Sequence, residues 1–269
     1  MSDQERVTIS LEDGVADVRF NRAEKMNALD NAQFNAIVAA IEKLSTMSGL
    51  RCIVVSGEGR AFCAGLDLSR FGSNGNDGAP SDRDFQKRTH GLANTGQQAA
   101  WGWRMLPVPV IAAVHGVAFG GGFQIMLGAD VRFVAPDTRL SVMETKWGLI
   151  PDMAGIALMR HLASDDIVRE LTYTAREFTG EQAKAYGFAT HLSANPHADA
   201  MTLAREIAGR SPHAVRAAKR VLNGARDGDA AGVLLSESRE IAALMGTPNQ
   251  IETFVSAQQK RKPNFQDVA

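Results

Sequence analysis

The segment that most constrains the fold is an uncharged stretch in the middle of the chain. No residue between Arg104 and Asp130 carries a formal charge, and the stretch is long enough to span a bilayer. It contains two prolines, five glycines, His115 and Gln124, which interrupt a membrane helix. They suit a buried strand, a tight glycine turn and a buried helix. We therefore expect a packed protein core here and no membrane partner.

Short apolar strands and amphipathic helices alternate through the first part of the chain. Strand patterns occur at residues 7–11, 15–20, 52–55, 108–114 and 131–134. Between the second and third of these, residues 30–44 repeat apolar side chains at helical spacing, with Asp30 as the predicted N-cap. The order strand, helix, strand indicates a parallel βαβ unit. We also expect a helix over residues 85–105.

The pattern becomes almost wholly helical from Gly180 onward. The predicted fold class is therefore α/β, with a core over residues 1–195 and a C-terminal helical region over residues 196–269. Residues 71–84 are rich in Gly, Ser, Asn and Asp and show no apolar period, so we expect a mobile loop there.

Composition narrows the classes of function. The 269 residues include 29 Lys and Arg against 30 Asp and Glu, and this balance argues against a nucleic-acid or membrane-surface partner. The two cysteines are too few for a disulfide scaffold or a four-cysteine zinc site. The first ten residues show no signal peptide. We expect a cytoplasmic protein.

Several common catalytic motifs are absent. The sequence has no phosphate-binding P-loop, no H-E-x-x-H, no G-x-S-x-G and no C-x-x-C pair. Metal-dependent and serine-nucleophile chemistry are disfavoured, and we expect no metal site.

Two glycine-bearing turns instead each follow an apolar strand, at residues 57–68 and 115–124. In parallel α/β sheets, ligands bind outside the carboxyl ends of strands, where such turns lie. Two backbone N–H groups that converge on one carbonyl oxygen form an oxyanion hole. Either turn taken alone is also typical of tight packing.

These turns belong to a larger resemblance. Segments 21–29, 61–68, 110–124, 143–155 and 260–265 resemble, in order, the crotonase (enoyl-CoA hydratase/isomerase) family. The likeness runs from about residue 7 to the C-terminus. It implies a crotonase-like spiral of ββα turns, closed by a C-terminal helical region that joins subunits into a homotrimer or a dimer of trimers.

The resemblance also implies an acyl-coenzyme A site. The amides of Leu66 and Gly121 would hold the thioester oxygen and the enolate that forms from it. Coenzyme A is part of this substrate, and no other cofactor is expected. The residues implied to contact the coenzyme are Arg22, Lys25, Ala28, Ala64 and Lys260, the last in its own subunit or a neighbouring one.

The acid–base positions distinguish this chain within the family. Hydratases of the family carry two glutamates; the second corresponds to Glu144, and the first is replaced by Gln124. An amide orients water but does not exchange a proton near neutral pH. Asp152 lies eight residues after Glu144, a spacing that resembles the dienoyl-CoA isomerases of the family. We also place Trp147, beside Glu144, in the acyl pocket.

Each of these polar residues has a structural alternative. Asp152 follows a proline at a predicted helix start and would suit a cap. Gln124 near a helix start would suit a capping-box bond. Glu144 would pair with Arg139 or Lys146.

The sequence thus predicts double-bond isomerisation of a 3,5-dienoyl-CoA, with Glu144 and Asp152 as the proton-transfer pair. The alternative within the family is hydration of a 2-enoyl-CoA, with Glu144 carrying the proton and Gln124 placing the water. Dehalogenation is disfavoured because Glu144 stands where the chlorobenzoyl-CoA dehalogenases have tryptophan. The alternative of another class is a non-catalytic acyl-CoA or RNA-binding homologue, and the balanced charge argues against RNA.

Overall fold

The computed structural model describes residues 5–67 and 85–268. The loop expected at residues 71–84 lies outside the described residues. The main sheet has six strands in the order β1-β2-β3-β4-β6-β9. They are β1 (Val7–Glu12), β2 (Val15–Phe20), β3 (Cys52–Gly57), β4 (Val110–Val114), β6 (Val131–Val134) and β9 (His191–Leu192). Only the β1–β2 pair is antiparallel; the other neighbours in this sheet run parallel.

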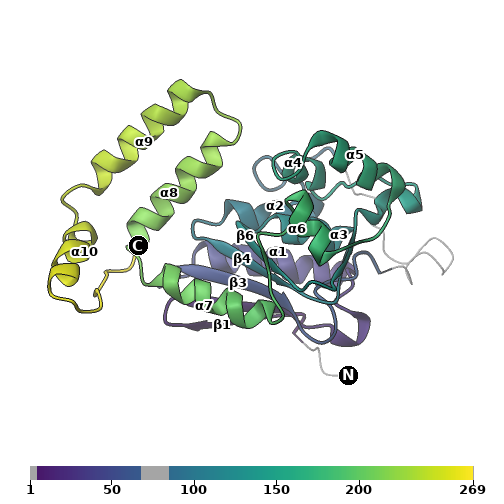
Figure 1. Ribbon diagram of the computed structural model, residues 1–269, viewed down its shortest axis with the longest axis horizontal. Helices are drawn as coiled ribbons and strands as arrows, with labels where there is room; N and C mark the ends of the chain where they lie inside the picture. The colour runs from purple at the N-terminus through teal and green to yellow at the C-terminus, as the bar shows by residue number, and fades with distance from the viewer. Residues whose placement is uncertain (1–4, 68–84, 269) are drawn as a thin grey trace.

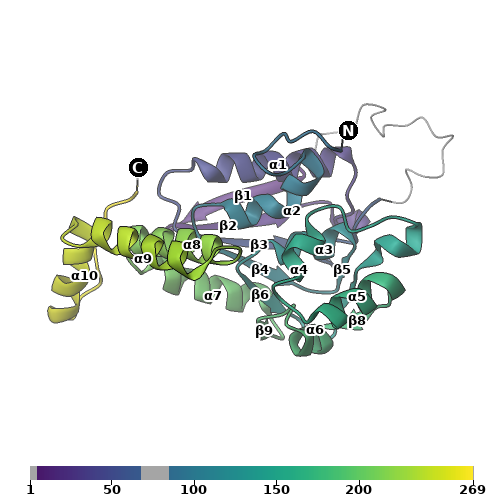
Figure 2. The same ribbon diagram turned by 90° about the horizontal axis from the view of Figure 1, so that it is seen from above.

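The central strands are buried on both faces, which explains their continuous apolar sequence. Ile53 and Val55 of β3 face the larger core, whereas Cys52 and Val54 face a smaller one. Helices α1 (Asn31–Ser45) and α2 (Thr95–Met105) cover the first face, and α7 (Pro196–Ala208) covers the second, as Figure 2 shows.

A smaller sheet stands beside the main one. It has three strands in the order β5-β7-β8, formed by β5 (Val117–Phe119), β7 (Arg139–Ser141) and β8 (Phe178–Thr179). Three helices lie around it: α3 (Gly121–Leu127), α4 (Gly155–Met159) and α6 (Gly180–Tyr186), with α5 (Asp165–Thr174) between the last two in sequence. The small sheet places the start of α3 next to the turn that follows β3, where Gly122 lies against Cys63.

The helix expected over residues 85–105 begins only at Thr95, so the first ten residues of that prediction are wrong. Asn94 caps α2 by accepting a hydrogen bond from the Gln97 backbone, and the Gln97 side chain bonds back to Asn94. Gly91 has a positive φ of 62°. This turn conformation interrupts any helix that approaches from the N-terminal side. The N-cap predicted at Asp30 is confirmed, since its side chain accepts from the Gln33 backbone.

The last three helices extend away from the sheet (Figure 1). These are α8 (Pro212–Ala225), α9 (Ala230–Leu244) and α10 (Pro248–Gln258). They expose large apolar side chains at Leu222, Leu234, Leu235, Ile241, Met245, Ile251 and Phe254. The preceding helix α7 packs against the sheet, so the first helix of the predicted C-terminal region contributes to the core. Within the described part of the chain, no helix is long and apolar enough to cross a membrane.

One buried ion pair anchors α8 to the body of the protein. The Lys219 ammonium lies 2.8 Å from a carboxylate oxygen of Asp130 and donates to the Val108 carbonyl at 2.7 Å. The same Asp130 oxygen accepts from the Val110 backbone. The Lys219 side chain is 6% exposed, so the pair is well shielded from water.

Lys219→Ala is expected to lower the free energy of unfolding by about 2–4 kcal/mol, because it leaves the Asp130 carboxylate partly buried without its cation. Urea denaturation measures this loss. The control is Arg210→Ala, whose exposed pair with Glu206 should contribute less than about 1 kcal/mol. Equal losses in the two variants would contradict an anchoring role for Lys219.

Candidate active site

The first glycine turn is held against the segment that precedes α1. Leu29 donates its backbone N–H to Gly65 at 2.8 Å, and Asp67 donates its own to Leu29 at 3.1 Å. Leu66 therefore lies between two bonds that fix its peptide, in a bridge to Leu29. Asn27 is buried and donates to the carbonyls of Glu58 and Ala61, which secures the start of the turn.

The second turn joins β5 to α3. Gly120 precedes the helix with a φ of 49°, and Gly121 is its first residue. The N–H groups of a first helical turn have no acceptor within the helix. Among the described residues, neither the Gly121 N–H nor the Leu66 N–H has a backbone acceptor.

The two turns are in direct contact. Cys63 donates its N–H to Val117 and accepts from Phe119, both at 3.1 Å. A Cβ atom on Gly65 would lie 2.4 Å from the Phe119 carbonyl oxygen and 3.6 Å from the Gly121 nitrogen. The approach therefore requires glycine at position 65, where φ is also positive at 81°. Leu66 and Gly121 stand at the adjoining ends of these turns, as an oxyanion hole requires.

Glu144 lies beside the second turn, in the short helix η3 (Met143–Trp147). Its Oε1 is 3.2 Å from the place that a Cβ on Gly120 would occupy. Oε1 accepts a hydrogen bond from Gln124 Nε2 at 2.6 Å, whereas Oε2 is buried with no partner among the described residues. Burial is the main cause that raises the pKa of Glu144. Hydrogen bonds from its own backbone and from Gln124 act in the opposite direction, and the negative charge of Asp152 raises the pKa by a smaller amount.

The pairing predicted for Glu144 with Arg139 or Lys146 does not occur. Arg139 instead donates to Glu177 at 2.7 Å, and the Lys146 ammonium lies 5.8 Å from the ring centre of Trp147. Glu144 is thus left with an uncommitted, poorly hydrated carboxylate oxygen, as a general base needs.

Gln124 is 1% exposed, in the first half of α3. Its Oε1 accepts the backbone N–H groups of Met153 and Gly155, so the side chain crosses to another segment and does not cap its own helix. Asp152 is exposed on that same segment, just before α4. The N-cap position of α4 is Ala154. The structure therefore brings Glu144, Gln124 and the segment of Asp152 together.

Comparison with known proteins agrees with this geometry. The family model described as enoyl-CoA hydratase/isomerase matches residues 10–268. The chain belongs to the enoyl-CoA hydratase/isomerase family. The mitochondrial methylglutaconyl-CoA hydratase of Mus musculus is 30% identical over 260 residues, covering 94% of this chain and 79% of that protein. A probable enoyl-CoA hydratase of Mycobacterium bovis is 32% identical over 260 residues, covering 97% and 99%.

The fold of this enoyl-CoA hydratase/isomerase family member matches solved structures. The crystal structure of an enoyl-CoA hydratase from Bacillus anthracis aligns with a TM-score of 0.86 at 26% identity, covering 97% of this chain and 98% of that one. The predicted α/β class with the crotonase-like core is confirmed. The relatives described above are named hydratases, so the likeness to dienoyl-CoA isomerases stays a prediction.

Among the residues expected to contact the coenzyme, Ala28, Ala64 and Arg22 all belong to the first glycine turn or to the segment beside it. The segment of Ala28 runs along the first turn, since Ala64 donates its N–H to Met26. The Arg22 guanidinium lies 2.7 Å from Asp67 and 3.2 Å from Asp30, so its charge is paired with carboxylates. This pairing stabilises the turn.

The two lysines implied to contact the coenzyme lie in different parts of the chain. Lys25 is exposed at the end of the short helix η1 (Ala23–Lys25). Lys260 follows α10, at the end of the molecule far from β5 and α3 (Figure 2). One chain therefore does not bring Lys260 to the two turns.

Exposed apolar side chains follow Glu144 along the chain. Trp147 is 50% exposed and lies three residues after Glu144 in the same short helix, whereas Trp103 fills the core. Leu149 and Ile150 are also exposed, and sequence reasoning missed them because they looked like core residues. An exposed apolar patch next to a buried carboxylate suits an acyl chain.

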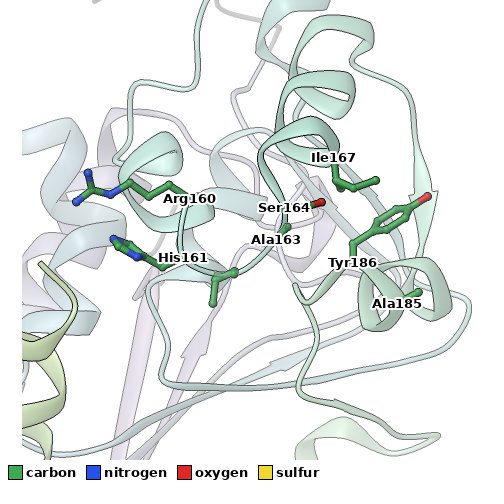
Figure 3. A pocket seen from close by; sticks show the side chains of 8 residues that line it. Arg160, His161, Ala163, Ser164, Ile167, Ala185 and Tyr186 are labelled. Atoms are coloured by element: carbon green, nitrogen blue, oxygen red, sulfur yellow. The ribbon is translucent and has the colours of Figure 1, made fainter.

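A separate hollow of about 580 Å³ lies near α5 and α6. Figure 3 shows Arg160 and His161 on one side of it and Tyr186 on the other. Arg160 and His161 both pair with Asp227, and none of the predicted catalytic residues lines this hollow. It is distinct from the candidate active site.

Glu144→Gln is expected to stabilise the folded protein at neutral pH. A carboxyl whose pKa is raised on folding favours the native state at pH values below its unfolded pKa of about 4.3, and this contribution is lost as the pH rises through the folded pKa. The melting temperature of Glu144→Gln should therefore exceed that of wild type at pH 8, with a smaller difference at pH 5. The exposed Glu177→Gln serves as control. A less stable Glu144→Gln at pH 8 would contradict this electrostatic account.

Proposed function

We propose that this chain moves a proton along the acyl group of an unsaturated acyl-CoA thioester, through an enolate held by the two glycine turns. One observation carries the proposal: Glu144 lies beside the turn that presents the Gly121 N–H, and its Oε2 is buried with no hydrogen-bond partner in the part of the chain that the structure describes. A poorly solvated carboxylate accepts a carbon-bound proton more readily than one in water.

The glycine turns supply the electrostatic part of this mechanism. The N–H groups of Leu66 and Gly121 would donate to the thioester oxygen, which gains negative charge as the proton leaves the neighbouring carbon. Donors fixed in place before the reaction need no reorganisation when this charge develops. Such a term commonly accounts for several kcal/mol of the barrier.

Isomerisation of a 3,5-dienoyl-CoA fits the proton-transfer groups best. Glu144 would remove the proton next to the thioester, and Asp152, after taking a proton from solvent, would deliver it farther along the conjugated chain. Glu144 would then return its proton to solvent, which restores both groups. Asp152 is close enough to raise the pKa of Glu144 through its charge. Gln124 is an amide whose Oε1 already accepts two backbone N–H groups, so that oxygen is committed and does not activate water.

Hydration of a 2-enoyl-CoA is the second candidate, because the relatives described above are named hydratases. In that case Glu144 would transfer the proton, and the remaining N–H of the Gln124 amide would orient the water. The two candidate reactions differ in their outcome: hydration adds water to the double bond, whereas isomerisation moves a proton from one carbon of the acyl chain to another.

The extended helices support an assembly of several copies, a homotrimer or a dimer of trimers. Six large apolar side chains of α8, α9 and α10, and that of Met245 directly after α9, are exposed in the single chain. In such an assembly, Lys260 would reach the coenzyme of a neighbouring subunit.

The deciding assay supplies 3,5-dienoyl-CoA and 2-enoyl-CoA separately and follows the absorbance of each. We expect the dienoyl substrate to convert to its conjugated 2,4 isomer. Glu144→Gln should lower turnover by at least about a hundredfold, since it removes the proton acceptor. Asp152→Asn should lower dienoyl turnover, and Glu177→Gln should leave it unchanged.

Other outcomes of this assay assign the site differently. Rapid hydration with no dienoyl conversion would replace isomerisation by the second candidate. Full activity in Glu144→Gln would assign that side chain to structure. Tight binding of acyl-CoA with no turnover of either substrate would make the chain a binding protein.

A further inference from the structure

Gln124 connects the two segments that carry the proposed acid–base pair. We propose that Gln124 is a positioning residue: its amide fixes Glu144 relative to the segment of Asp152 and leaves one defined Glu144 oxygen to take the proton. This inference rests on the proposed function, since it assigns Gln124 a role toward the group that transfers the proton.

The hydrogen bonds of this amide run to both segments. Oε1 accepts from the Met153 N–H at 2.8 Å and from the Gly155 N–H at 2.9 Å. Nε2 donates to Glu144 Oε1 at 2.6 Å. Met153 directly follows Asp152 in the chain. One buried side chain therefore holds a catalytic carboxylate on one side and the backbone next to Asp152 on the other.

The Gln124 side chain fills the space directly beside Gly155. A Cβ atom on Gly155 would lie 2.6 Å from Gln124 Oε1 and 2.8 Å from its Cδ and Cγ atoms. Gly155 is not among the glycines with positive φ, so its backbone conformation is open to any residue. Glycine is required at position 155 because the Gln124 side chain occupies the room that a methyl group would need.

Only an amide side chain at position 124 can make all three of these hydrogen bonds when Glu144 is ionised. Its oxygen has two lone pairs for the two backbone N–H groups, and its nitrogen donates to the carboxylate. A carboxylate at position 124 would still accept both N–H groups but would repel Glu144. Asp152 already places a negative charge near Glu144, so a third carboxylate would raise the pKa of Glu144 further.

The hydrogen bond from Gln124 also determines which oxygen of Glu144 takes the proton. Oε1 of Glu144 is engaged by Gln124, whereas Oε2 is buried and unpaired among the described residues. A single oxygen without a hydrogen-bond partner among the described residues, on a fixed carboxylate, gives one line of approach to the substrate carbon. Gln124 would thus raise the rate of reaction by orienting Glu144 toward the substrate, and would not transfer a proton itself.

The test compares Gln124→Glu and Gln124→Met with wild type. The ionisation of Glu144 is followed without substrate by ¹³C NMR of carboxyl-labelled glutamate, with the signal assigned by its loss in Glu144→Gln. We expect a higher pKa for Glu144 in both variants, because both lose the Nε2 donor. The acid limb of the kcat profile should move to higher pH, with kcat at pH 7 reduced at least about tenfold and KM within about threefold of wild type.

Stability separates the two variants. Gln124→Glu keeps an acceptor for Met153 and Gly155, so at a pH low enough for one of the two facing carboxyls to hold a proton, its melting temperature should stay closer to wild type than that of Gln124→Met. Gln124→Met leaves both N–H groups unpaired and should melt at a clearly lower temperature. The control is Gln182→Glu, the same change in the exposed capping box of α6, which should move none of these values.

An unchanged Glu144 pKa together with wild-type kcat in Gln124→Glu would overturn the positioning role. Because the titration needs no substrate, it separates this inference from the proposed function. If the pKa of Glu144 rises in the Gln124 variants but the wild-type protein turns over no acyl-CoA, the positioning role of Gln124 is supported and the proposed proton-transfer function is overturned.

Discussion

The close contact between the two glycine turns is the constraint on which the site depends. Cys63 bonds to both Val117 and Phe119, and Gly65 has no side chain to hold the strands apart. The same contact joins the large sheet to the small one, so it fixes α3 and with it Gln124 and Glu144. A bulkier residue at position 65 would therefore displace the amides and the acid–base groups together.

Within this rigid backbone, the ionised form of Glu144 lowers the stability of the folded protein. Glu144 carries a poorly hydrated oxygen that lowers the stability of the ionised native state, and burial is the main reason that its pKa is raised. A core made only for stability would not retain such a group. The surrounding hydrogen bonds hold the carboxylate in place without neutralising it, and this is the condition under which it accepts a proton from carbon.

Sequence patterns predicted β1, β2, β3, β4, β6 and the two turns, because buried strands and glycine turns leave strong local signals. They missed β5, β7, β8 and β9, which have only two or three residues each and are too short for a periodic pattern. Residues 85–94 were assigned to a helix wrongly, since the capping box at Asn94 depends on side-chain bonds that periodicity does not reveal. The partners of Glu144 and Gln124 lie 20 to 31 residues away in the chain, and no local pattern indicates them. The family resemblance supplied the candidate residues, and the tertiary contacts showed how they are connected.

Isotope-edited infrared spectroscopy of a bound acyl-CoA, labelled with ¹³C at the thioester carbonyl, tests the central claim most directly. Two backbone N–H donors on one oxygen should move the carbonyl stretch to clearly lower frequency than in solution, because they polarise the bond. A carbonyl frequency that stays at its solution value while the ligand is bound would show that the Leu66 and Gly121 amides do not meet at the thioester oxygen.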